Sequence, residues 1–336
     1  MEFRMNNNRV TFADKNIKET TVLYIDSVPI ATLGNISALV GKPKCGKTLN
    51  LSAMVAAGVT SAKVLNYFGR LPANKGRIIY IDTEQSKLHC YKQLNRIAEL
   101  ANVSEAFLMD KLYFYALREY SPNQRIDFIA HVLENISNIG LLVIDGIRDL
   151  LYDINCPTQS SQLINTLMMW SSKYNMHIIT VLHLNKSDDN TRGHLGSELN
   201  NKAECVVKII KKELKSNLCS VVPLYTRDKE FSSFTFLINN NGLPELTDNC
   251  ISDSLRRGIR NEDITEEQHR QALNKALGPN VMTGYENLKE AVKNAYGSIG
   301  LDFGYNRIVS LIKYLKANNI LVAEGKGYKY NEDFII

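Results

Sequence analysis

The stretch Ile36-Ser-Ala-Leu-Val-Gly41-Lys-Pro-Lys-Cys-Gly46-Lys47-Thr48-Leu-Asn-Leu-Ser-Ala-Met-Val-Ala-Ala57 decides the fold. It joins a β-branched run, a loop framed by glycines and an apolar segment of helical character, which predicts a strand, a loop and a helix in succession. The loop fits the pattern G-x-x-x-x-G-K-[ST], in which backbone N–H groups close around phosphates. The positive end of the following helix dipole adds to this attraction. The stretch therefore predicts a nucleotide phosphate site.

The residue types of this loop predict ATP and Mg²⁺ as cofactors. The pattern assigns Lys47 to the β- and γ-phosphates and Thr48 to the magnesium ion. An ordinary turn leading into a helix is the alternative reading of these two residues. The residues expected to line the ATP are Gly41, Lys42, Pro43, Lys44, Cys45, Gly46, Lys47, Thr48 and Leu49.

Composition sets wide limits on the class of protein. The chain has 336 residues, of which 44% are hydrophobic, enough for one large globular domain or two smaller ones. A net charge of +5 permits contact with nucleic acid without demanding it. The six cysteines form no C-x-x-C pair, so we expect reduced thiols, with no zinc site. Because no signal peptide and no bilayer-length apolar run is present, we expect a cytoplasmic protein without membrane contact.

Continuous apolar strands alternate with helical periodicity through the first two thirds of the chain. This pattern predicts an α/β fold with a mostly parallel sheet and helices on both faces, with ligands at the carboxyl ends of the strands. Three consecutive strands that follow predict an antiparallel extension. We expect core strands at 77–82, 111–117, 140–145 and 177–184, helices at 87–102, 123–136 and 159–174, a polar loop at 185–196, and the extension at 204–213, 218–226 and 234–239.

The sequence suggests two domains. We expect an N-terminal arm over 1–20, a nucleotide-binding domain over 21–245 that starts with a short strand or lead-in at 21–30, a linker over 246–267 and a smaller domain over 268–336. In the last, helices at 285–296 and 305–318 precede a hairpin at 320–330, the plan of a winged helix. A small α+β cap without a nucleic-acid role is the alternative.

Three strand-end residues complement the phosphate loop. Asp145 is expected to hold the magnesium ion that Thr48 ligates. Glu84 could deprotonate the water that attacks the γ-phosphate, with Asp82 as a competing base. His183 could contact the γ-phosphate and report it to the next loop, or be an ordinary core histidine.

The loop after His183 contains the cations Lys186, Arg192 and His194 beside flexible glycines. Such cations suit contact with the phosphate backbone of DNA. Each of them alone also fits an ordinary solvated charge.

Taken in order, five segments resemble the motifs of RecA-like ATPases, closest to the RepA-type hexameric helicases of plasmids and mobile elements. They are the loop 41–48, Ile-Asp-Thr-Glu84, Val-Ile-Asp145-Gly, His183-Leu-Asn-Lys186 and Thr226-Arg-Asp-Lys229, and the resemblance covers roughly 25–245. It implies a homo-oligomeric ring, expected to be a hexamer, with ATP between subunits and Glu84 as the catalytic base.

The resemblance also implies that a basic residue from the neighbouring subunit completes each site. Arg227 matches best, with Lys229 beside it and Arg192 in reserve. Here the order is Arg-Asp-Lys where relatives often show Lys-x-Arg, and the phosphate loop has Lys-Pro-Lys-Cys in place of small residues.

Three functions follow as hypotheses. The first is a ring-forming ATPase motor acting on single-stranded DNA, a replicative helicase of a mobile element. The second is an ATP-switched DNA-binding regulator or loader that does not translocate. The third is a small-molecule kinase built on the same loop.

Overall fold

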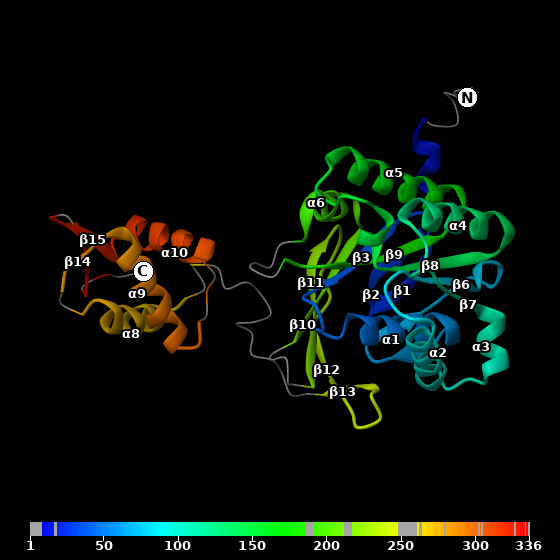
Figure 1. Ribbon diagram of the computed structural model, residues 1–336, viewed down its shortest axis with the longest axis horizontal. Helices are drawn as coiled ribbons and strands as arrows, with labels where there is room; N and C mark the ends of the chain where they lie inside the picture. The colour runs from blue at the N-terminus through cyan, green and yellow to red at the C-terminus, as the bar shows by residue number, and fades with distance from the viewer. Residues whose placement is uncertain are drawn as a thin grey trace. The chain divides into compact units, whose positions relative to one another are not determined.

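The computed structural model describes residues 9–16, 19–185, 191–211, 217–247, 261, 264–278, 280–301, 303, 305–325, 327–332 and 334. The chain divides into two compact units, the larger containing nearly all of the first 250 residues and the smaller beginning at Ile251. Figure 1 shows both units, and each is described by itself.

A nine-stranded sheet, counted over the described residues, forms the centre of the larger unit. Its parallel part runs in the order β10 (Cys205–Lys211), β3 (Ile36–Gly41), β9 (His177–His183), β8 (Ile139–Asp145), β6 (Arg77–Asp82) and β7 (Leu112–Ala116). Beyond β10 it continues antiparallel through β11 (Leu218–Thr226), β12 (Phe234–Ile238) and β13 (Pro244–Thr247). Every residue of β3 and β8 is buried, as continuous apolar strands between two helical layers require. The predicted α/β fold, with a mostly parallel sheet and an antiparallel extension, is confirmed.

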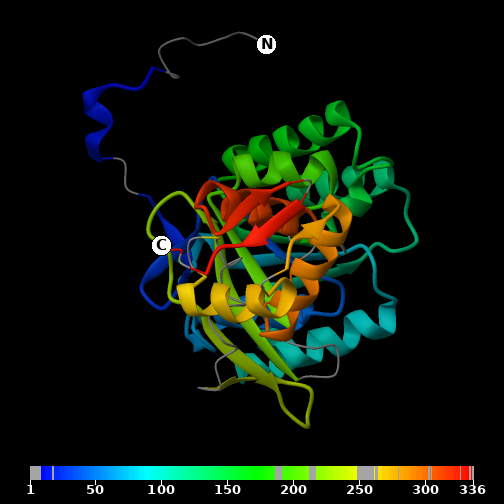
Figure 2. The ribbon, with the colours of Figure 1, turned by 90° about the vertical axis from the view of Figure 1, so that its left-hand side faces the viewer.

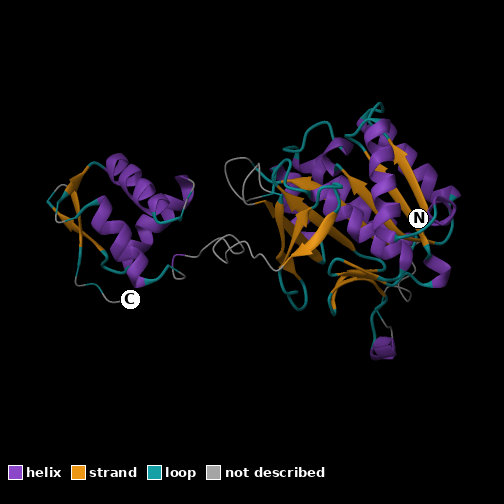
Figure 3. Ribbon diagram, turned by 90° about the horizontal axis from the view of Figure 1, so that it is seen from below, coloured by secondary structure: helices purple, strands orange, loops and turns teal. Residues whose placement is uncertain are grey.

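Helices cover both faces of this sheet, as Figures 1 and 3 show. One face packs against α1 (Lys47–Thr60), α2 (Lys87–Ala101) and α3 (Glu105–Lys111). The other packs against α4 (Pro122–Asn135), α5 (Pro157–Lys173) and α6 (Gly193–Lys202). Short 3₁₀ turns are η2 (Phe12–Asn16), η3 (Ala73–Lys75) and η4 (Ile147–Leu150). The sheet thus has a core on each side and presents the ends of its strands to ligands.

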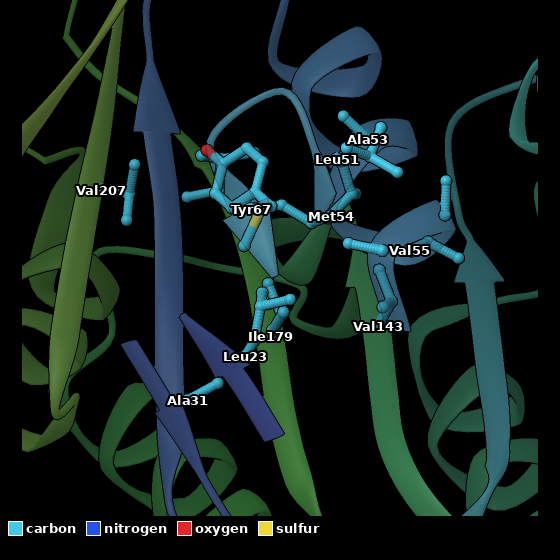
Figure 4. Packing of buried hydrophobic residues seen from close by; sticks show 14 of the residues in the cluster. Leu23, Ala31, Leu51, Ala53, Met54, Val55, Tyr67, Val143, Ile179 and Val207 are labelled. Carbon is cyan, nitrogen blue, oxygen red and sulfur yellow. The ribbon is translucent and has the colours of Figure 1, made fainter. Parts of the chain in front are cut away.

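A second, four-stranded sheet lies over α1 in the order β2 (Val28–Thr32), β1 (Thr21–Ile25), β5 (Tyr67–Gly69) and β4 (Lys63–Val64). The prediction of a short strand or lead-in over 21–30 is corrected to two strands, because the chain turns at Asp26, with φ 51°, and pairs β1 with β2. Figure 4 shows the Tyr67 ring beside Leu51 and Met54 of α1. This sheet therefore holds the helix that follows the phosphate loop.

Two predictions on the class of protein can be compared with the described residues. No helix among them is both long and apolar enough to cross a membrane. The described cysteines are all free thiols, namely Cys45, Cys90, Cys156, Cys205 and Cys219.

The smaller unit contains α8 (Glu266–Ala276), β14 (Met282–Thr283), α9 (Tyr285–Ser298), α10 (Tyr305–Ala317), β15 (Leu321–Glu324) and β16 (Gly327–Tyr330). Its strands pair in the order β14-β16-β15, and its helices enclose a core of their own. Figure 2 shows the hairpin of β15 and β16, in red, beside the helices of the same unit. Helix α8 was not predicted and begins inside the expected linker over 246–267, where a capping box between Thr265 and Gln268 starts it.

A buried polar group lies at the amino ends of β9 and β10. Glu204 accepts hydrogen bonds from Thr32 N and Oγ1, at 2.7 and 2.5 Å. Nδ1 of His177 lies 3.5 Å from Glu204 Oε1 and 2.8 Å from the Thr32 carbonyl. Burial lowers the pKa of His177 from 6.5 to about 4 and raises that of Glu204 from 4.5 to about 7.

These two pKa values act on stability in opposite directions. The unfolded chain protonates His177 near pH 6.5 and the folded chain only near 4, so acidification destabilises the fold through His177. The folded chain protonates Glu204 near pH 7 and the unfolded chain only near 4.5, so acidification stabilises it through Glu204. Between about pH 7 and pH 4.5 the two effects on the free energy of unfolding nearly cancel.

Glu204→Gln should expose the acid sensitivity of His177. Between pH 7 and pH 4.5 we expect the free energy of unfolding of the variant to fall by about 3 kcal/mol more than that of wild type. Urea unfolding at intervals of pH measures the difference, with Glu245→Gln on exposed β13 as control. An unchanged pH profile in Glu204→Gln would contradict the assigned pKa values.

Candidate nucleotide-hydrolysis site

The strand register brings the predicted residues to one edge of the sheet. Gly41 at the end of β3 pairs with His183 at the end of β9. Asp82 at the end of β6 pairs with Asp145 at the end of β8. Four parallel strands therefore end at the phosphate loop, as the sequence predicted for a ligand site.

The loop 41–48 has the backbone that its glycines allow. A Cβ atom on Gly41 would lie 2.5 Å from Cys45 Sγ and 2.7 Å from the Ile209 carbonyl, so no larger residue fits without a shift. Gly46 has φ 93°, which glycine adopts readily. Cys45 is buried, and burial raises the pKa of its thiol, so it fills the loop as a small residue. Lys44, with φ 62°, is exposed at the outside of the loop.

Lys47 is held in place by groups of the protein itself. Its Nζ donates to the carbonyls of Gly41 and Lys42, both at 2.9 Å, and lies 2.9 Å from Nδ1 of His183. Because an ammonium group only donates, Nδ1 accepts this hydrogen bond. Burial lowers the pKa of Lys47, and the carboxylates of Asp145 and Glu84 act against this. The amino group of Lys47 is therefore fixed beside the first residues of the phosphate loop.

Thr48 and Asp145 fit the chemistry of a magnesium site. Thr48 Oγ1 lies 3.4 Å from Asp145 Oδ2, so a hydroxyl and a carboxylate oxygen lie side by side. Burial and the neighbouring Asp82 raise the pKa of Asp145 to about 7, while the Tyr80 hydroxyl and Lys47 act against this rise. The described residues contain no cluster of three His, Cys, Asp or Glu side chains suited to a metal. Phosphate oxygens and water would complete the ion's coordination, as Mg²⁺ prefers.

Glu84 stands beside His183 at the open side of the site. Its Oε1 lies 3.6 Å from Nε2 of His183, and 41% of its side chain is exposed. Hydrogen bonding to His183 lowers the pKa of Glu84, against the smaller opposing effect of partial burial. The carboxylate is therefore charged at neutral pH and open to water, as a general base needs.

Asp82, the competing base, has another task in this structure. Its Oδ1 accepts from the backbone N–H groups of Glu84 and Gln85, at 2.9 and 2.7 Å. The side chain is buried, and burial raises its pKa. Asp82 thus shapes the turn that presents Glu84, which supports Glu84 as the base.

Two residues that the sequence analysis missed hold these strand ends together. Thr83 Oγ1 lies 3.0–3.1 Å from three acceptors, the carbonyls of Asp145 and Gly146 and Asp149 Oδ2, and its one hydroxyl hydrogen is shared among them. The buried guanidinium of Arg125 donates to carbonyls in three loops, at Leu117, Asp149, Thr83 and Arg118. No local pattern indicates them, because their partners come from distant strands.

The predicted cations lie at two different edges. Arg192 and His194 are exposed at the start of α6, near Thr191, which bridges to Leu184 just after β9. Lys186 lies outside the described residues. Arg227 and Lys229 are exposed after β11, whose last residue pairs with Cys205 at the amino end of β10. They therefore lie at the far end of the sheet from their own phosphate loop.

Comparisons with known proteins address the family. A solved structure of the RadB recombinase matches with a TM-score of 0.45 and 16% sequence identity, over 65% of this chain and 93% of that chain. A search of curated proteins found no match. The sequence model of the AAA domain family matches residues 15–189, just over half of the chain. With the loop and strand-end residues above, this match supports an ATPase of the P-loop class. The chain belongs to the AAA domain family.

Proposed function

We propose that the protein is an ATP-hydrolysing ring motor, a hexamer that acts on single-stranded DNA as a replicative helicase of a mobile element. One observation carries the proposal: Lys47, Thr48 and Asp145 lie at the same sheet edge as Glu84 and His183 and in contact with one another or with them. These are the parts of a hydrolytic site rather than of a loop that only binds a nucleotide.

In this proposal each side chain has one task. Glu84 accepts the proton of the attacking water, and Lys47 stabilises charge that develops on the β- and γ-phosphate oxygens. Thr48 and Asp145 hold Mg²⁺, which, when bound, neutralises those oxygens. His183 contacts both Lys47 and Glu84. A γ-phosphate bound between Lys47 and Glu84 would therefore replace these two contacts of His183. The following loop, with Arg192 and His194, would then change its contact with DNA.

The second half of each site would come from a neighbouring subunit. Arg227 and Lys229 are exposed and lie away from their own phosphate loop, as a residue acting in trans must. A closed ring of identical head-to-tail contacts supplies one such residue to every site.

The alternative proposal is an ATP-switched DNA-binding regulator or loader. The order α8-β14-α9-α10-β15-β16, with β14 paired to β16, favours a winged helix in the smaller unit. In that arrangement α10 is the candidate recognition helix and the β15–β16 hairpin the wing. A small-molecule kinase would also need an acceptor pocket and a lid, and the exposed Arg227 and Lys229 after β11 fit a ring better.

The motor proposal predicts that single-stranded DNA stimulates ATP hydrolysis and that Lys47→Ala abolishes it. Loss of one charged phosphate donor should lower kcat roughly 10²- to 10³-fold. Hydrolysis is measured with and without a single-stranded oligonucleotide, and particle mass with an ATP analogue. Lys63→Gln is the control, since it removes an exposed lysine charge on β4, outside the phosphate loop.

Three outcomes decide between the proposals. A ring that unwinds a duplex with a single-stranded tail supports the motor. Binding to a duplex site without unwinding would favour the regulator. Wild-type hydrolysis in Lys47→Ala, or no effect of DNA on either binding or hydrolysis, would end the motor proposal.

A further inference from the structure

Tyr80 lies beside the carboxylate of Asp145, on the strand between β8 and the edge strand β7. It belongs to β6, is fully buried, and its hydroxyl lies 2.9 Å from Asp145 Oδ2 on the neighbouring strand. A carboxylate only accepts, so the tyrosine hydroxyl donates. Its ring stacks on Phe114 of β7, with centroids 4.3 Å apart and planes 10° apart. The ring therefore cannot turn its hydroxyl away from Asp145 without breaking a packed core.

Gln93 of α2 fixes the direction of this hydrogen bond. Its Nε2 donates to the Tyr80 hydroxyl oxygen, which leaves the hydroxyl hydrogen for Asp145. Gln93 is itself buried, and among the described residues its Oε1 has no hydrogen-bond partner. A buried amide with one unused acceptor costs stability. Among the described residues, the side chain of Gln93 makes one hydrogen bond, to the Tyr80 hydroxyl.

The two donors to Asp145 reach the same oxygen. Tyr80 OH and, at a longer 3.4 Å, Thr48 Oγ1 both point to Oδ2. With Oδ2 held from behind, the plane of the carboxylate is set, and Oδ1 is the oxygen left for a water of the magnesium ion. Packing and hydrogen bonding from α2 through β6 thus determine where the ion's water can bond.

We propose that Tyr80, supported by Gln93, is a positioning residue that orients Asp145 for Mg²⁺ and so couples α2 to the metal site. This inference rests on the proposed function, because it assumes that Asp145 serves a nucleotide-bound magnesium ion. It predicts that removing one hydroxyl changes the magnesium dependence of nucleotide binding and leaves metal-free binding unaltered.

The test measures ADP affinity by calorimetry, in EDTA and in excess Mg²⁺. In wild type, Mg²⁺ should tighten ADP binding. Tyr80→Phe should lose about 10-fold of that gain, the usual effect of removing a partner that orients a metal ligand. Its affinity in EDTA should equal that of wild type. Gln93→Leu should lose part of the gain. Mn²⁺ binding followed by electron paramagnetic resonance should rank the proteins in the same order, with wild type the tightest, then Gln93→Leu, then Tyr80→Phe.

Tyr67→Phe is the matched control. Tyr67 is equally buried, and its hydroxyl donates to Asn50 of α1 at 3.0 Å, so this variant also loses one buried hydroxyl but none next to Asp145. If Tyr80→Phe keeps the full magnesium gain, the inference is wrong while the proposed function stands. If wild type does not bind ADP, the proposed function itself fails. If Tyr80→Phe does not fold, judged by thermal melting, an undiminished gain in Gln93→Leu would overturn the inference.

Discussion

Glu84→Gln is expected to bind ATP about as tightly as wild type and to hydrolyse it roughly 10²- to 10⁴-fold more slowly. The amide keeps the shape of the carboxylate but cannot take a proton from the attacking water. Lys47 and the backbone of the phosphate loop supply the binding, and neither depends on Glu84. Binding of a fluorescent ATP analogue and single-turnover hydrolysis separate the two effects.

Two further variants sharpen this test. Glu245→Gln makes the same chemical change at an exposed position of β13 and should hydrolyse ATP normally. Asp82→Asn should weaken the turn that holds Glu84, since Oδ1 of Asp82 accepts two backbone N–H groups there. Near-normal turnover in Glu84→Gln together with a larger loss in Asp82→Asn would move the base to Asp82.

The sequence predicts best those site residues that lie at the end of a continuous apolar strand. Gly41, Asp145 and His183 each follow a continuous apolar run, and parallel strands bring such ends to one edge. The residues that support them could not be found in this way. Tyr80 and Arg125 look like ordinary core or helix residues until their partners on other strands are known.

The missed helices have local physical reasons. Helix α6 starts with Gly193 and contains Gly196, residues of low helix propensity, so its sequence resembles a loop. Gly196 is needed there because a Cβ atom would lie 2.6 Å from Thr191. Helix α8 is rich in charge and buries only His269, Ala272 and Leu273 within its span. Its capping box was the one signal that could have revealed it.

The register of β10 and β11 also could not be predicted, and it determines where Arg227 lies. The resemblance assigns this arginine to the nucleotide site of a neighbouring subunit, and the pairing of Thr226 with Cys205 puts it at the far edge of its own sheet. Its guanidinium donates to the Lys202 carbonyl at 2.9 Å, on the exposed surface. In the proposed ring, Arg227 would therefore serve the phosphate of a neighbouring subunit.

Arg227→Ala is accordingly expected to lower hydrolysis roughly 10³- to 10⁵-fold, as loss of an arginine finger does. Nucleotide binding by the isolated chain should persist, because Lys47, Thr48 and Asp145 remain in place. Lys229→Ala is the matched control, since it removes a neighbouring exposed cation and should have the smaller effect if Arg227 is the finger. The reverse order would assign the role to Lys229.

Mixing the two inactive variants tests whether the finger acts in trans. In a ring assembled from equal amounts of Arg227→Ala and Glu84→Gln subunits, about a quarter of the interfaces combine an intact Glu84 with an intact Arg227 from the neighbour. Activity should therefore return to about a quarter of the wild-type rate when sites act independently. Each variant mixed with itself stays inactive, which provides the baseline. An inactive mixture whose particle mass still shows assembled rings would contradict a finger in trans, because intact pairs would then be present without hydrolysis.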